Sequence, residues 1–67
     1  MRMQEIRNLS DTDLHGELFN TLKELMNLRF RHVTKQLTDT SQLGITKKKI
    51  ARLRTEITQR TLQEVQS

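Results

Sequence analysis

The sequence predicts an all-α protein, built as a long antiparallel two-helix hairpin with a short N-terminal helical piece. The chain of 67 residues has no proline and only two glycines, so it contains few residues that break helices. Apolar residues recur at helical spacing over two long stretches. Only a short polar cluster separates these stretches, which favours two antiparallel neighbours. We expect residues 1–67 to form a single helical-hairpin domain.

The first element is a short helical turn at about residues 3–8, and the first long helix follows it. Ser10 can cap that helix, and Asp11 and Asp13 suit the positive end of its dipole. Leu9 would then pack toward Leu14 as a hydrophobic staple. This pattern predicts a first long helix at about residues 11–35.

The polar residues at 38–41 predict the turn between the long helices, with Asp39 or Thr40 as the next N-cap. The second long helix is then expected at about residues 41–64.

Each long helix carries an apolar stripe that predicts the seam between them. A helix turns by about 100° per residue, and at that spacing one face of the second helix gathers Leu43, Thr46, Ile50, Leu53 and Ile57. The matching stripe on the first helix consists of Leu14, Leu18, Leu22, Leu25 and Leu28. We expect these two stripes to form the core.

The first helix carries a second apolar set, made of Phe19, Met26, Phe30, Val33 and Leu37. Two helices have only one mutual seam, so this set needs another explanation. Either the N-terminal residues Met3, Ile6 and Leu9 fold over part of it, or it is an apolar surface for another molecule. In the second case Phe19, Met26, Phe30 and Val33 are the candidate protein-contact residues.

The net charge of +4 is concentrated in the C-terminal part of the chain. Residues 1–40 carry six basic and six acidic side chains, whereas residues 41–67 carry six basic side chains against Glu56 and Glu64. Five of those six lie in the segment KKKIARLR at residues 47–54. This asymmetry indicates a polyanionic partner, with nucleic acid favoured over an anionic membrane surface.

We expect Lys48, Lys49 and Arg52 to point away from the seam, and Lys47 and Arg54 to share its edge. Two interpretations stay open: a solvated basic face, or a face that contacts RNA phosphates by charge and shape. The candidate RNA-binding residues are Lys47, Lys48, Lys49, Arg52 and Arg54, with Arg29, Arg31, Lys35 and Arg60 as secondary candidates. Arg29 lies beside the seam, where Glu56 is an alternative partner for it.

Nothing in the sequence favours an enzyme. The chain has no cysteine, which excludes thiolate metal sites, and His15 and His32 lie about 25 Å apart along one helix. No phosphate-binding loop, nucleophile with a base, or paired carboxylates are visible. We therefore expect no catalytic residues, no cofactor and no metal. The N-terminus lacks the apolar run of a signal peptide or a membrane span.

Several segments, taken together, carry a family resemblance. The most specific are Asn-Leu-Arg-Phe at residues 27–30, Gln-Leu at 36–37 and Ile-Ala-Arg at 50–52. In that order and spacing the chain resembles the bacterial-type large-subunit ribosomal protein twenty-nine family (uL twenty-nine), nearly end to end. The family often has glycine at the position of Lys35 and an acidic residue at that of Lys49.

The resemblance implies a helical hairpin that binds large-subunit ribosomal RNA near the opening of the peptide exit tunnel. It further implies ribosomal protein twenty-three as a neighbour, nascent-chain factors close by, and a location in the ribosome of the cytoplasm or of a plastid. By position, Lys47, Lys48 and Arg52 match the family's basic segment, and Arg29 matches its Asn-Leu-Arg-Phe motif. The alternative function is a protein-interaction module that dimerises through its second apolar set, whereas the ribosomal function implies a monomer in isolation.

Overall fold

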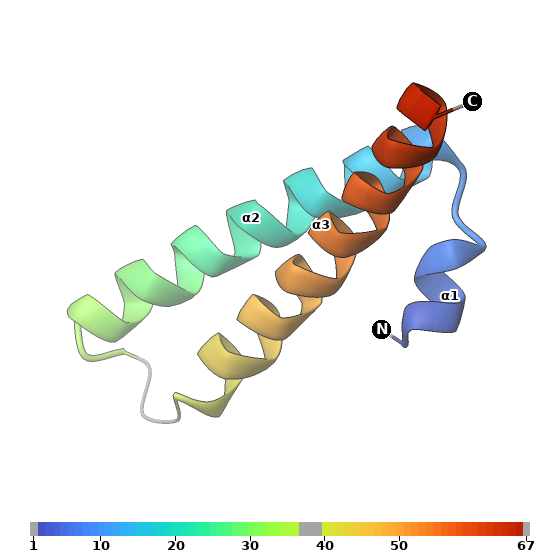
Figure 1. Ribbon diagram of the computed structural model, residues 1–67. Coiled ribbons are helices and arrows are strands. Elements are labelled where there is room, and N and C mark those ends of the chain that lie inside the picture. The colour runs from blue at the N-terminus through green and yellow to red at the C-terminus, as the bar shows by residue number, and fades with distance from the viewer. Residues whose placement is uncertain (1, 37–39, 67) are drawn as a thin grey trace.

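The computed structural model describes residues 2–36 and 40–66, and within them it contains three helices. The helix α1 spans Met3–Arg7, α2 spans Asp11–Val33 and α3 spans Ser41–Gln66. The two long helices run antiparallel, and α1 lies beside α3 near the end that carries both termini (Figure 1). The molecule is a rod of 49 × 17 × 16 Å. The predicted all-α hairpin with a short N-terminal helix is therefore confirmed.

The start of α2 is fixed by its N-cap. Ser10 has an extended backbone, and its side-chain oxygen accepts a hydrogen bond of 3.1 Å from the backbone N–H of Asp13. This bond satisfies one of the backbone donors that a helix leaves unpaired at its first turn. Leu9 packs against the core cluster that contains Leu14, which places the two predicted staple residues together.

The end of α2 is a reverse turn with a left-handed residue. The helix ends at Val33, slightly before the predicted residue 35, because Lys35 adopts a φ of 63° that no helix can continue. The N–H of Lys35 donates to the carbonyl of His32, and that of Gln36 donates to the carbonyl of Arg31 over 2.8 Å. These two bonds form a Schellman motif, which normally has glycine at the left-handed position. The predicted caps of α3 are Thr40, which directly precedes it, and Asp39, which lies outside the described residues.

We expect Lys35→Gly to raise the free energy of unfolding by about 1 kcal/mol, because glycine carries no Cβ to strain a positive φ. Lys35→Ala is the matched control, since it removes the same charge and keeps the Cβ. Urea denaturation followed by circular dichroism measures both variants. Equal midpoints for the two variants would show that the left-handed backbone costs the protein nothing.

The core lies along the predicted seam and includes a contribution from α1. Its completely buried apolar side chains are Ile6, Leu14 and Leu53, one from each helix. Farther along the seam Leu25, Leu28 and Ile50 are buried, whereas Leu18, Leu22, Leu43 and Ile57 are half-buried. The prediction that these stripes form the core is confirmed. Within the described residues, no helix is both long enough and apolar enough to cross a membrane.

Polar side chains also take part in the core. Thr21, Thr46 and Glu56 are buried, and only Thr46 belonged to the predicted stripes. The Thr21 hydroxyl donates to the carbonyl of Glu17 over 2.6 Å, so its burial leaves no donor unpaired.

Arg60 joins all three helices at the end of the hairpin opposite the turn. Its guanidinium donates to the carboxylates of Asp11 at 2.7 Å and Glu56 at 3.0 Å. It also donates to the backbone carbonyls of Arg7, at the end of α1, and of Leu9, in the connection to α2. The hydrogen bond that Arg60 donates to Asp11, followed by the one it donates to Glu56, raises the pKa of Arg60 above its ordinary value. These five residues are called the Arg60 cluster below.

Candidate nucleic-acid interface

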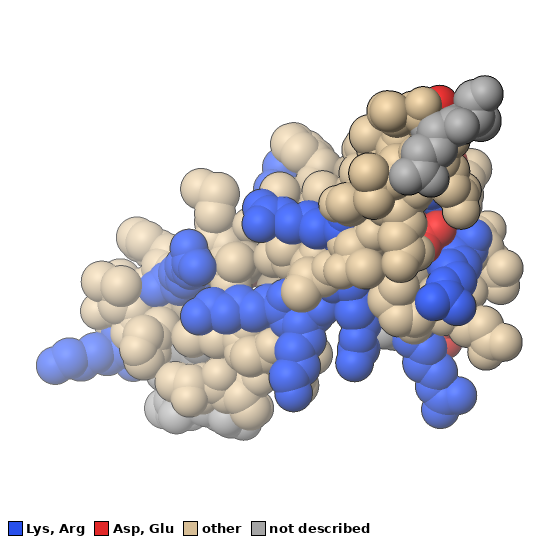
Figure 2. Space-filling view, in the orientation of Figure 1, with Lys and Arg blue, Asp and Glu red and all other residues tan. Residues whose placement is uncertain are grey.

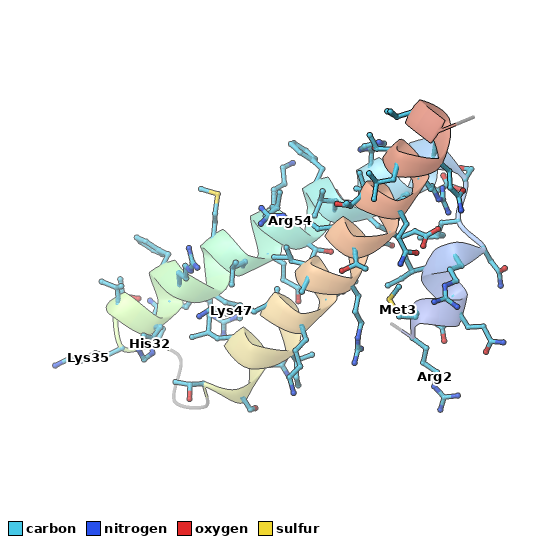
Figure 3. All side chains as sticks on the ribbon, in the orientation of Figure 1. Arg2, Met3, His32, Lys35, Lys47 and Arg54 are labelled. Atoms are coloured by element: carbon cyan, nitrogen blue, oxygen red, sulfur yellow. The ribbon has the colours of Figure 1, made fainter. Side chains whose placement is uncertain are left out.

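The basic segment of α3 distributes its side chains over more than one side of the hairpin. Lys47 and Arg54 are seven residues apart, which is about two helical turns, so they point in the same direction. Both line the space between α2 and α3, and Figure 3 shows Lys47 between the two ribbons. Lys48 and Arg52 are exposed and, at about 100° per residue, lie on the face of α3 that points away from the seam, as predicted.

A groove of about 340 Å³ separates α2 from α3 on the side that carries Lys47 and Arg54. Arg29 reaches it from α2, so three cationic side chains from two helices meet there. The groove is lined by Leu22, Leu25, Arg29, Lys47, Ile50, Ala51 and Arg54. We call it the cationic groove. The sequence had left open whether Arg29 pairs with Glu56. In the structure Glu56 pairs with Arg60, and Arg29 lines the groove.

The prediction that Lys49 points away from the seam is wrong. Its amino group lies 3.4 Å from a carboxylate oxygen of Glu17 on α2, and its side chain is only 27% exposed. The reason is helical geometry: residue 49 is three residues after Thr46 and four before Leu53, both of which are buried. Lys49 therefore borders the core and bridges the two long helices.

The secondary RNA-binding candidates Arg31, Lys35 and Arg60 lie in different parts of the molecule. Arg31 is exposed in the last turn of α2, and Lys35 is exposed at the turn end of the hairpin (Figure 3). The guanidinium of Arg60 is instead occupied by the acceptors of the Arg60 cluster. A phosphate contact by Arg60 would have to compete with two carboxylates and two carbonyls.

The second apolar set remains on the surface. Phe19 is 60% exposed, Met26 71%, Phe30 65% and Val33 77%, and these four residues are called the apolar stripe. The N-terminal helix does not cover them, because α1 packs against α3 and its Ile6 joins Leu14 and Leu53. Of the two alternatives left open by the sequence, the exposed surface is therefore the one that the fold adopts. Leu37, the fifth predicted member, lies outside the described residues.

The two surfaces adjoin on α2. Arg29 is three residues after Met26 and four before Val33, so it is their neighbour on the helix surface. At the other end of the stripe, the amino group of Lys23 lies 4.7 Å from the centre of the Phe19 ring. The apolar stripe is thus bordered by cations.

Basic side chains dominate the face of the molecule shown in Figure 2. Lys and Arg extend from much of this face, with only small areas of acidic atoms among them, whereas the C-terminal end of α3 shows no basic side chain in this view. Such a surface attracts polyanions. With its groove and exposed cations, it can contact a chain of phosphates without reading individual bases.

Comparison with known proteins identifies relatives of this chain. Residues 4–60 match the family described as Ribosomal L29 protein. A large ribosomal subunit protein uL29 from Finegoldia magna is 48% identical over 62 residues, which cover 92% of this chain and 91% of that protein. A large ribosomal subunit protein uL29 from Thermosipho africanus is 45% identical over 62 residues, which cover 92% of this chain and 94% of that protein. No solved structure matches the chain significantly.

Proposed function

The chain belongs to the ribosomal L29 family, and from this premise we propose that it binds large-subunit ribosomal RNA through the basic side of α3. Family membership makes it a structural protein of the large ribosomal subunit, and such proteins generally have no enzymatic role. The observation that supports RNA binding is the concentration of cations on α3, most of which are exposed. Two of these cations, Lys49 and Arg60, each pair with a carboxylate of α2.

The proposed mechanism is electrostatic. Lys48 and Arg52 contact phosphates from the exposed side of α3, while Lys47, Arg54 and Arg29 do so from the cationic groove. Each phosphate that a cation neutralises releases condensed counterions, so affinity depends steeply on salt. Arg31 and Lys35 are exposed at the turn end and extend the same surface. Lys49 and Arg60 form ion pairs with carboxylates, so they contribute to RNA binding only through the overall positive potential of the surface.

The apolar stripe supports a protein contact as the second part of this function. An exposed stripe of two Phe, one Met and one Val resembles the anchor residues of protein interfaces. From the family resemblance we propose a position near the opening of the peptide exit tunnel, with ribosomal protein twenty-three as neighbour and nascent-chain factors nearby.

Sedimentation of a cell lysate through a sucrose gradient tests the function. We expect the chain to migrate with the large subunit after a high-salt wash. Paired replacement of Lys48 and Arg52 by alanine should reduce its occupancy in the subunit, while Gln59→Ala with Gln63→Ala, also exposed on α3, should not. For purified protein and RNA, the salt slope of binding should fall by about 0.7 to 0.9 for each phosphate contact removed. Unchanged occupancy and slope in the Lys48 and Arg52 variant would remove these residues from the interface.

A dimerising interaction module is the second candidate, and the exposed apolar stripe is the observation that favours it. Light scattering on the isolated chain separates the two functions. The ribosomal function predicts a monomer, because the stripe meets its neighbour only in the assembled subunit. A stable dimer, together with a chain found solely at the top of the gradient, would favour the module instead.

A further inference from the structure

We propose that the cationic groove is a phosphate-binding site, in which Arg29 of α2 and Lys47 and Arg54 of α3 hold one RNA phosphate between the two helices. This inference rests on the proposed function and makes it more specific. A general basic face would attract RNA anywhere along α3, whereas this site fixes one phosphate at a defined place. Its occupant joins the two arms of the hairpin.

The first support is the convergence of charge from two separate helices. Arg29 comes from the C-terminal half of α2, whereas Lys47 and Arg54 lie two turns apart on the antiparallel α3. All three line one groove, and Figure 3 shows Lys47 between the two ribbons. A single anion in the groove is therefore within reach of cations on both sides.

The second support is that these charges lack internal partners. Among residues 2–36 and 40–66, no carboxylate pairs with Arg29, Lys47 or Arg54, whereas Lys49 pairs with one carboxylate and Arg60 with two. Three like charges around one groove repel one another, and this repulsion opposes the packing of α2 against α3. An anion in the groove would turn that repulsion into attraction and so stabilise the folded hairpin.

The third support is the floor of the groove. Leu22, Leu25, Ile50 and Ala51 line it between the cations, and Leu25 and Ile50 are buried. An apolar floor offers no competing acceptor and keeps water from one side of the site, which strengthens the pull of the cations. Ala51 is small, so its side chain leaves room for an anion to approach α3.

The chemistry of the side chains favours phosphate over carboxylate. Two guanidinium groups present rigid forks of N–H donors that match the oxygens of a phosphate, and Lys47 adds a compact point charge. A phosphodiester offers its free oxygens to several donors at once, whereas a carboxylate is satisfied by one fork. The occupant that fits this set is therefore an RNA backbone, with an acidic peptide as the competitor to be tested.

Nuclear magnetic resonance on the full chain labelled with ¹⁵N tests the site. The side-chain Nε–Hε signals of Arg29 and Arg54 should shift together when sodium phosphate or a short oligouridylate is added at low ionic strength. At equal ionic strength, replacing sodium chloride by sodium phosphate should raise the melting temperature of the unchanged protein more than that of Arg29→Gln, because the general stabilising effect of phosphate is common to both. Arg29→Gln and Arg54→Gln should each weaken oligouridylate binding about tenfold, because each removes charge-assisted hydrogen bonds.

Ala51→Leu is the sharpest variant, because it fills the groove and leaves every charge in place. It should weaken oligouridylate binding while helicity stays unchanged, whereas Gln59→Leu, exposed elsewhere on α3, should bind normally. Normal binding by Ala51→Leu and Arg29→Gln would overturn the site, even if Lys48 and Arg52 still mattered for RNA. Equally strong shifts with polyglutamate would replace RNA by an acidic peptide as the occupant. Failure of the chain to migrate with the large subunit would instead count against the proposed function.

Discussion

Leu53→Ala should lower the free energy of unfolding by about 3 kcal/mol, as is typical when a buried leucine is truncated. Leu53 is completely buried and belongs to the hydrophobic cluster to which α1, α2 and α3 each contribute one buried side chain. The loss therefore combines removed apolar contact with a cavity that three helices border. A chain of this size rarely gains more than about 3–5 kcal/mol from its core, so the variant should be largely unfolded near room temperature.

Far-ultraviolet circular dichroism during urea denaturation measures this loss. Leu62→Ala is the matched control, because it makes the same substitution on the same helix at a residue that is 52% exposed. The control should stay within about 0.5 kcal/mol of the unchanged protein. Similar losses for the two variants would mean that the predicted seam does not carry the stability of the fold.

Arg60→Met should be the most damaging replacement of any charged residue. It leaves the buried carboxylate of Glu56 without its partner and leaves the carbonyls of Arg7 and Leu9 without their donor. A largely buried charge that loses its partner destabilises the fold, because the cost of removing it from water is no longer offset by the ion pair. Because those carbonyls lie at the end of α1 and in the loop after it, α1 should also detach from α3.

Two measurements check this outcome. The melting temperature should fall well below that of Arg31→Met, which replaces an exposed arginine of α2. Trypsin should also cut after Arg2 and Arg7 faster than in the Arg31 variant, because these bonds lie around the released helix. Retention of both the melting temperature and the protease resistance would show that the Arg60 cluster is dispensable.

The pKa of Arg60 determines how this contribution depends on pH. Folding raises the pKa of Arg60. The stability that the charged Arg60 contributes is therefore fully present below the ordinary pKa of arginine, and it is lost only as the pH rises past the pKa in the folded state. The cluster should therefore stay intact across the neutral range with respect to the charge of Arg60.

Local patterns were enough to predict the helices and most of the core. Helical spacing identified Leu14, Leu25 and Leu53, and the sequence before Asp11 identified Ser10 as a cap. These features depend on neighbours within a few residues, which is the range over which periodicity and capping act. The same spacing contained the evidence against an outward Lys49, because residue 49 lies between two seam residues.

Contacts between distant parts of the chain were not predictable in the same way. Asp11 and Arg60 are 49 residues apart, and no periodicity relates them. The docking of α1 on α3 rather than on the apolar stripe is likewise decided by the tertiary arrangement, because both surfaces are apolar. The cationic groove was not predictable from the sequence either. Arg29 and Lys47 are on different helices, and only the packing of α2 against α3 shows that they line the same groove.

The slender shape of the molecule implies that its resistance to local opening is uneven. The three-helix cluster of Ile6, Leu14 and Leu53 and the Arg60 cluster lie away from the turn, whereas only two helices meet near the turn, where Val33 is exposed and Leu43 is half-buried. Backbone amides near the turn should therefore exchange with solvent through small, frequent openings, and those around Leu53 only through global unfolding. The turn end of the hairpin should therefore be the part whose backbone adjusts most easily when the protein binds a partner.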